Sequence, residues 1–99
     1  MEAVGGVLGR VMQGLGLGTA LRGWQAVEAW PRVVGPRVAR HTRAVSFRDG
    51  TLNVEVEGSA WMHELGYLKR QLVHKVNEHL GDEVVRELRF SIFRGGSLR

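Results

Sequence analysis

Between Val45 and Val56, apolar and polar residues alternate on either side of the dipeptide Asp49-Gly50. Such an alternation is typical of β-strands that bury one face, because successive side chains point to opposite sides of a sheet. Asp-Gly between two such runs favours a tight hairpin turn. The apolar positions, expected on one face of the hairpin, are Val45, Phe47, Leu52, Val54 and Val56. We therefore predict an antiparallel hairpin whose apolar face must be covered by another element.

The stretch from Ser59 to Leu80 follows the hairpin and is predicted to form one continuous amphipathic helix that covers it. Ser59 is the expected N-cap, and Gly81-Asp82 is expected to end the helix. The apolar stripe consists of Trp61, Leu65, Leu68, Leu72 and Val76, widened by Met62, Val73 and Leu80. The opposite side carries His63, Tyr67, Arg70, His74 and Asn77. The pattern gives one helix face to the core and leaves a basic, partly aromatic face to solvent.

Two helices are predicted before the hairpin. Residues 2–17 have a helical spacing of apolar residues but contain several glycines, each of which costs about 0.5–1 kcal/mol relative to alanine, so this helix depends on tertiary contacts. Thr19 is the expected cap of a second helix that begins near Ala20 and ends at Gly35, before Pro36. Its apolar residues are Leu21, Trp24, Val27 and Trp30. We expect both tryptophans to fill the core against the long helix.

The segment from Val84 to Phe93 is predicted to be a third strand, with Leu88, Phe90 and Ile92 facing inward. A strand-helix-strand connection favours parallel pairing with one hairpin strand through a right-handed crossover. The predicted order is α-α-β-β-α-β, an α+β fold in which a three-stranded sheet packs against helices. A chain of 99 residues has room for a single domain. We place that domain at residues 1–93 and a short basic tail at residues 94–99.

Arginine dominates the charge of the chain, with twelve arginines and two lysines against ten acidic residues and a net charge of +4. This excess favours a polyanionic partner such as nucleic acid, although an arginine-rich surface can also reflect the general amino-acid usage of the host. Cysteine is absent, which excludes disulfides and thiolate metal sites. We find no apolar run as long as a membrane span and no secretion signal, so a cytoplasmic location is expected.

No motif for catalysis or for cofactor binding is complete. The alternating glycines at residues 14–18 have neither a preceding strand nor a following lysine, as a phosphate-binding loop would require. His63-Glu64 would begin a zinc-protease motif only with a second histidine at the position of Tyr67. His74 and His79 point to different sides of the predicted helix, which argues against a catalytic pair. We therefore predict no catalytic residue, no metal, no cofactor and no enzymatic activity.

Several spaced motifs lie between Trp30 and Phe90. They are Trp30-x-x-Val33-Val34-Gly35, Ala39-x-His41-Thr42, Asp49-Gly50-x-Leu52-x-Val54-x-Val56, Ser59-x-Trp61-x-x-Glu64-Leu65, Asn77 and Val85-x-x-Leu88-x-Phe90. In order and spacing they resemble the DciA family, over roughly two-thirds of the chain. The resemblance implies a KH-like domain that binds the DnaB-type hexameric replicative helicase and single-stranded DNA, with double-stranded DNA as a further candidate. It also implies a DNA replication initiation factor that assists helicase loading without ATP, away from membranes and associated with the nucleoid.

KH domains grip nucleic acid through a GXXG loop that joins two helices. Gly66 lies inside the predicted long helix and has no partner glycine, so we expect sequence-tolerant phosphate contacts instead of KH-type readout. The candidate DNA contacts are Arg40, Arg43, Arg48, Lys69, Arg70, His74, Arg86, Arg89 and Arg94. Trp61 and Tyr67 are candidate contacts to a partner.

These candidates have alternatives. Trp61 also fits the core, and Arg43 or Arg89 could pair across the sheet with Glu55 or Glu57. The alternative function is that of a KH-like RNA-binding protein associated with ribosome maturation, because KH-like folds and basic charge serve RNA equally well.

Overall fold

The sheet is built on the predicted hairpin. In the computed structural model, which describes residues 17–93, β1 (Thr42–Arg48) pairs antiparallel with β2 (Thr51–Val56). Asp49 and Gly50 form the turn with φ values of 52° and 82°. Positive φ at both central residues matches the twist of the flanking strands. β3 (Glu87–Ile92) lies parallel to β2, so the strand order is β1-β2-β3 and the predicted parallel pairing is confirmed.

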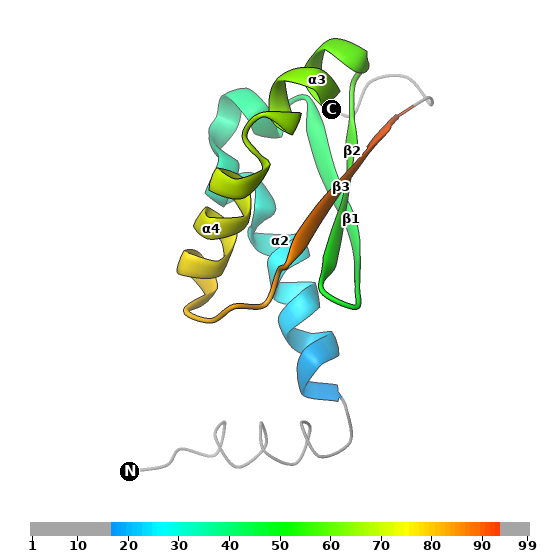
Figure 1. Ribbon diagram of the computed structural model, residues 1–99. Helices are drawn as coiled ribbons and strands as arrows, with labels where there is room; N and C mark the ends of the chain where they lie inside the picture. The colour runs from blue at the N-terminus through cyan, green and yellow to red at the C-terminus, as the bar shows by residue number, and fades with distance from the viewer. Residues whose placement is uncertain (1–16, 94–99) are drawn as a thin grey trace.

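The helices of the described chain lie on one side of this sheet (Figure 1). They are α2 (Leu17–Ala39), which packs against β1, α3 (Ser59–Gly66), which contacts β2 and β3, and α4 (Lys69–Leu80), which packs against α2 and β3. The α+β class and the three-stranded sheet packed against helices are confirmed. Almost all of the helix predicted at residues 2–17, and the tail at 94–99, lie outside the described residues. Among the described helices, none is long and apolar enough to cross a membrane.

The core lies between the sheet and the helices. Its fully buried side chains include Trp30, Leu52, Leu65, Val54, Val56, Val76, Val85 and Leu88. Trp30 Nε1 donates a hydrogen bond of 2.9 Å to Thr42 Oγ1, and this hydroxyl donates one of 2.9 Å to the carbonyl oxygen of Val38. Buried polar groups destabilise a fold unless they are paired. This chain of hydrogen bonds lets an indole and a hydroxyl lie inside the core.

The expectation that Trp24 fills the core is wrong, because 56% of its surface is exposed. A step of three residues turns an α-helix by about 300°, so a stripe spaced in threes winds around the helix. Trp24 therefore lies about 120° from Trp30. The side of α2 that faces the sheet carries Gly23 instead. There the helix backbone is so close to β1 that a Cβ on Gly23 would overlap the ring of Phe47.

β1 contains a bulge that changes which residues face the core. The register between β1 and β2 shifts between Ala44 and Ser46, and Val45 is 40% exposed where an inward position was predicted. An extra residue in one strand shifts its alternation, so Arg43 and Ala44 exchange the faces that strict alternation would give them, whereas Phe47, beyond the bulge, still packs against the core. Ala44 is half-buried in the place of Val45. The solvent side of β1 therefore carries Arg43, Ser46 and Arg48.

The prediction of one continuous helix from Ser59 to Leu80 is wrong, because the chain breaks between α3 and α4. The amides of Tyr67 and Leu68 donate to carbonyl oxygens three residues earlier, at 3.3 and 3.0 Å, which tightens the end of α3. Leu68 then leaves the helical region, with φ −102° and ψ 4°. Gly66, a poor helix former, is the last residue of α3. The break lets α3 follow β2 and β3 while α4 packs against α2.

The helix ends agree with the prediction only in part. Thr19 lies inside α2, and Ser59 is the first residue of α3, so neither is an N-cap. Gly58 takes the cap position of α3 without a side-chain hydrogen bond. Gly81 ends α4 as predicted, with φ 76°. Gly35, predicted to end the second helix, leaves the helical region with φ 84°, but α2 continues beyond it to Ala39. The glycine signals were therefore more informative than the hydroxyl caps.

Asn77 fixes the loop between α4 and β3. Its Oδ1 accepts hydrogen bonds from the amides of Val84 and Val85, at 3.0 and 2.8 Å, and its Nδ2 donates one of 2.8 Å to the carbonyl oxygen of Val85. Strand pairing begins only at Glu87, so β3 is shorter than the predicted Val84–Phe93. The contacts of Asn77 set the point at which the chain enters the sheet.

Candidate nucleic-acid interface

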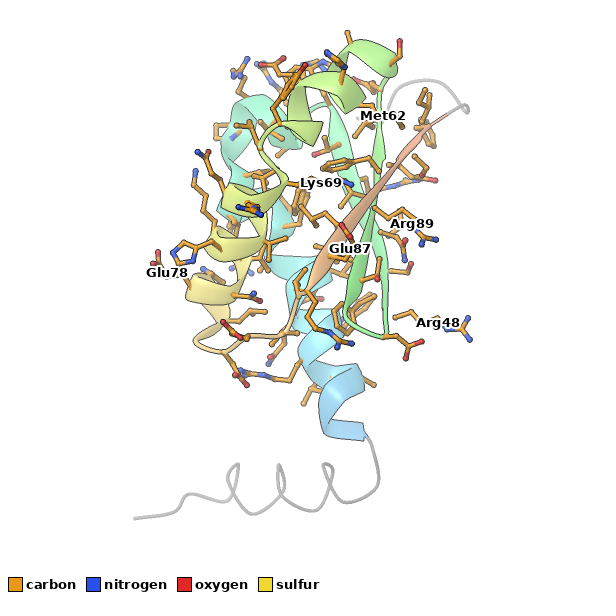
Figure 2. The ribbon with its side chains drawn as sticks, in the orientation of Figure 1. Arg48, Met62, Lys69, Glu78, Glu87 and Arg89 are labelled. Carbon is orange, nitrogen blue, oxygen red and sulfur yellow. The ribbon has the colours of Figure 1, made fainter. Side chains whose placement is uncertain are left out.

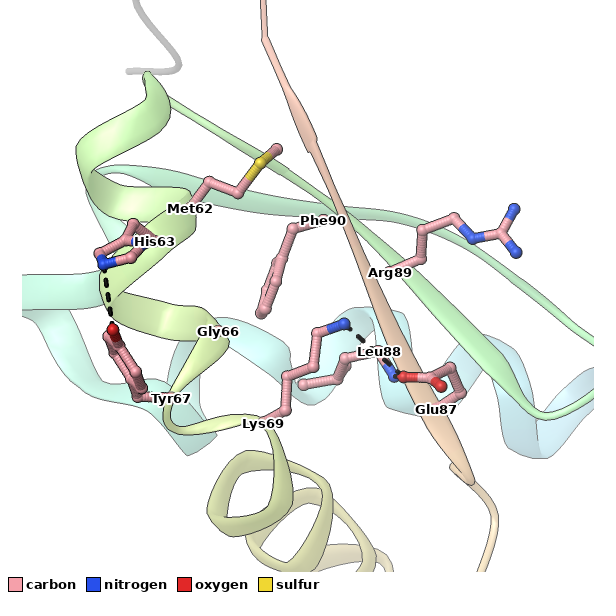
Figure 3. A pocket seen from close by; sticks show the side chains of 9 residues that line it. All are labelled: Met62, His63, Gly66, Tyr67, Lys69, Glu87, Leu88, Arg89 and Phe90. Carbon is pink, nitrogen blue, oxygen red and sulfur yellow. Dashed lines mark hydrogen bonds and ion pairs between the residues drawn. The ribbon is translucent and has the colours of Figure 1, made fainter.

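A groove of about 570 Å³ runs between the α3–α4 junction and the edge strand β3 (Figure 3). We call it the junction groove. Its lining residues come from both sides and are Met62, His63, Gly66, Tyr67, Lys69, Glu87, Leu88, Arg89 and Phe90. The groove exists because the helix breaks at Gly66, which brings the start of α4 to the edge of the sheet.

The two walls of the junction groove present different chemistry. Lys69, the first residue of α4, extends across the groove toward β3 (Figure 3). Along β3, the alternation of a strand turns Leu88 and Phe90 toward the helices and Glu87 and Arg89 toward solvent. The groove therefore has an apolar inner side and a charged rim.

One cation of this rim is paired and one is not. Lys69 Nζ lies 3.8 Å from Glu87 Oε1 and 5.6 Å from the centre of the Phe90 ring. Arg89 is exposed and has no acidic partner among the residues that the structure describes. An exposed ion pair such as Lys69–Glu87 contributes little in water, so an incoming anion can exchange with its carboxylate.

An aromatic pair occupies the other rim. Tyr67 is 77% exposed, and its hydroxyl lies 3.1 Å from His63 Nε2. The two rings meet edge to face, with centres 5.0 Å apart and planes at 83°. An exposed ring beside cations is the arrangement on which unpaired bases stack. Tyr67 and His63 thus give the groove an exposed aromatic rim opposite its charged one.

The other side of the sheet is polar, and no described helix covers it (Figure 1). We call it the open face. The strand register arranges its residues in three rows across the sheet: Arg48, Thr51 and Glu87; Ser46, Asn53 and Arg89; Arg43, Glu55 and Ser91. Part of it is hollowed, with a volume of about 250 Å³, and is lined by Arg48, Asp49, Thr51, Asn53 and Arg89.

The predicted contacts fall into two groups near these surfaces. Lys69, Arg89 and Tyr67 are brought together in the junction groove. Arg43 and Arg48 lie on the open face. Arg43 forms a 2.8 Å ion pair with Glu55, its partner in the register, so the predicted alternative of a cross-strand pair is confirmed for this residue.

The remaining predicted contacts lie apart from the groove. Arg40 follows α2 in an exposed turn, and Arg70 and His74 are on the solvent side of α4, where His74 lies 3.5 Å from Glu78. Arg86 Nη2 donates to the carbonyl oxygen of Asp49 at 3.1 Å, beside the hairpin turn. Arg94 lies outside the described residues.

Trp61, the other predicted partner contact, is half-buried. Its ring stacks on that of His41, with centres 4.6 Å apart, and the Arg37 guanidinium lies 5.4 Å from its centre. His41 Nδ1 in turn lies 2.8 Å from Glu57 Oε1. Trp61 therefore ties the start of α3 to the ends of α2 and β2.

Six of the residues that line the groove were not among the predicted contacts: Met62, His63, Gly66, Glu87, Leu88 and Phe90. Met62, Leu88 and Phe90 were expected in the core, and His63 was expected on the solvent face of the helix and considered as a metal ligand. Gly66 was the one signal in the sequence that could have located the groove, because a glycine inside a long amphipathic pattern marks a possible break.

Comparison with known proteins gives a consistent picture. A family model described as "Dna[CI] antecedent, DciA" matches residues 3–90. A UPF0232 protein of Corynebacterium glutamicum is 31% identical over 88 residues, which cover 89% of this chain and 49% of that protein. UPF0232 proteins of Mycobacterium bovis and Rhodococcus jostii are 35% and 34% identical over 77 residues, which cover 71% of this chain and 41% of each relative. The chain thus spans about half or less of the length of these relatives.

Proposed function

Because the chain belongs to the DciA family, we propose that it binds single-stranded DNA and the DnaB-type replicative helicase and assists helicase loading without hydrolysing ATP. At the level of the family, the match supports a role in DNA replication and helicase loading. A loader without a phosphate-binding loop can act only through binding energy, by favouring one helicase conformation over another. The DNA-binding part of the proposal is therefore central.

The observation that carries it is the junction groove. In a KH domain, a GXXG loop between two helices holds the nucleic-acid backbone. Here α3 ends at Gly66, α4 begins at Lys69, and Tyr67-Leu68 joins them, so lysine stands in the place of the second glycine. A lysine does not let the nucleic-acid backbone approach the protein backbone as closely as a glycine does, but its positive charge can attract a phosphate. This chemistry favours binding that tolerates sequence and weakens with salt.

The groove favours single strands over duplex. Tyr67 can stack only on a base that is unpaired, and every base offers a π-face. Lys69 and Arg89 line the same groove and would offer their charges to the phosphates of such a strand. Duplex DNA would offer these cations its phosphates but would leave the aromatic rim unused.

The test is a charge reversal with a matched control. Lys69→Glu should weaken binding of a labelled single-stranded oligonucleotide about tenfold or more at low salt, independently of its sequence. Lys75→Glu makes the same change on the exposed side of α4, away from the groove, and should have a much smaller effect. Fluorescence anisotropy measures both. Equal losses in the two variants would contradict a site in the groove.

Titration against purified replicative helicase, with and without single-stranded DNA, tests the partner. Binding should be accompanied by a change in helicase loading or unwinding. Recovery of ribosomal subunits without helicase, together with tighter binding of RNA than of DNA, would instead favour the ribosome-maturation alternative.

A further inference from the structure

We propose that the open face of the sheet is a second subsite for single-stranded nucleic acid, continuous with the junction groove through Arg89. A strand that leaves the groove would cross β3 at Arg89, pass over Asn53 on β2 and reach Arg48 on β1. This inference rests on the proposed function of the groove. It adds the route of the bound strand beyond the groove and the number of nucleotides that the protein covers.

Arg89 connects the two hollows because it lines both of them. It projects from the edge strand toward solvent, between the groove and the open face. In Figure 2, Arg48 and Arg89 lie on the side of the sheet away from α4, whereas Lys69 and Glu87 lie near the groove. The two arginines thus mark the two ends of one polar surface.

The middle row of the open face lies along the proposed path. Ser46, Asn53 and Arg89 are partners in the strand register, and Asn53 Nδ2 donates a hydrogen bond of 3.0 Å to Ser46 Oγ. Thr51 stands next to them in the hollow. Amides and hydroxyls of this kind bond to phosphate and sugar oxygens and fix the register of a bound strand.

The charge of this surface is compatible with a polyanion. Glu55 is neutralised by Arg43 at 2.8 Å, and Glu87 lies 3.8 Å from Lys69. Asp49 lies 3.9 Å from Arg48, but both side chains are about nine-tenths exposed, and such a pair is weak in water. Arg48 can therefore turn to a phosphate without losing a strong contact.

The aromatic residues of the sheet limit what this subsite can recognise. Phe47 and Phe90 are half-buried on the helix side, and the ring of Phe93, just beyond β3, lies 5.1 Å from the Arg43 guanidinium, at the other end of the open face from Arg48. Among the described residues, the proposed path from Arg89 to Arg48 therefore has no ring for stacking. Its contacts are therefore to the backbone, and the subsite should add affinity without sequence preference. Base stacking stays in the groove, at Tyr67.

The geometry predicts the additional footprint. Neighbouring strands lie about 4.8 Å apart, so β1 is about 10 Å from β3. A fully stacked strand advances about 3.4 Å per nucleotide, and an unstacked strand advances further, so this distance corresponds to at most about three nucleotides. Oligonucleotides that only fill the groove should not reach Arg48, and slightly longer ones should.

A length series with three variants tests the path. Homopolymeric single strands of about 4 to about 16 nucleotides span the site sizes of small single-strand-binding domains. Arg48→Glu should leave the affinity for the shortest strands unchanged and lower that for longer strands about tenfold. Lys69→Glu should weaken binding at every length. Arg32→Glu, an exposed change on α2, is the control and should alter the affinity for neither short nor long strands.

Two outcomes separate the subsite from the groove. If Arg48→Glu binds every length as the unmodified protein does, while Lys69→Glu is weak throughout, the subsite is wrong and the groove stands. If Lys69→Glu has no effect at any length, the groove itself is wrong. Arg48 is exposed, so circular dichroism should confirm that its variant is folded.

A second measurement locates the strand directly. The chain has no cysteine, so Thr51→Cys provides a single position for a fluorophore inside the hollow of the open face. A quencher on the end of a long strand should reduce its emission, whereas one on a groove-length strand should not. Equal quenching by both, or by neither, would overturn the path across the sheet.

Discussion

Trp30 and Trp24 lie on the same helix in opposite environments. Trp30 is 1% exposed and donates a hydrogen bond to Thr42 Oγ1, whereas Trp24 is 56% exposed. The indole of Trp30 thus contributes both apolar burial and a satisfied polar group. Replacing each tryptophan by phenylalanine therefore separates the effect of burial and hydrogen bonding at Trp30 from the general effect of losing a tryptophan.

Trp30→Phe should lower the free energy of unfolding by about 1–3 kcal/mol, because it removes buried atoms and the hydrogen bond to Thr42. Trp24→Phe should change it by less than about 0.5 kcal/mol, as exposed substitutions usually do. Urea unfolding followed by circular dichroism measures both. Similar losses in the two variants would mean that Trp24 is covered in solution.

At the scale of elements, the sequence predicted the types and order of the described helices and strands but not their breaks. The turn at Asp49-Gly50 was predictable because its chemistry is local. The break after Gly66 was not, because Leu65, Leu68 and Leu72 keep their helical spacing through it. The helix breaks there because α3 and α4 pack against different elements. The spacing of apolar residues carries no information about those packing surfaces.

For the candidate site, likewise, the residues were predictable from the sequence but their arrangement was not. Lys69, Arg89 and Tyr67 were recognised individually, because charge and exposure can be inferred from a sequence. That they line one groove depends on the break and on the position of β3, both of which are tertiary. The bulge at Val45 likewise decided which residues reached the open face.

Asn77 joins two of these elements, and its loss should be costly. Asn77→Ala removes three hydrogen bonds to Val84 and Val85, each worth about 0.5–1.5 kcal/mol, so the free energy of unfolding should fall by about 2–4 kcal/mol. Asn53→Ala removes a single exposed bond to Ser46 and should cost less than about 1 kcal/mol. Chemical unfolding compares the two. Equal costs would show that the loop before β3 is held by other contacts.

At the scale of the whole molecule, the net charge of +4 and the positions of individual cations affect the binding of a polyanion in different ways. Net charge attracts any polyanion over a distance, and this attraction is screened within about 10 Å at moderate salt. Placed cations release counterions on contact, so each contributes to the slope of log K against log salt concentration. Variants of equal charge can distinguish the two.

The double variant Lys69→Ala, Arg89→Ala should reduce the magnitude of that slope for single-stranded DNA by about 1.4, since each phosphate contact contributes about 0.7. Arg32→Ala, Lys75→Ala lowers the net charge by the same amount on exposed helix positions and should leave the slope nearly unchanged. Anisotropy titrations across a range of salt concentrations give both slopes. If the two double variants lose slope equally, binding follows net charge alone, and neither the junction groove nor the path over Arg89 is a defined site.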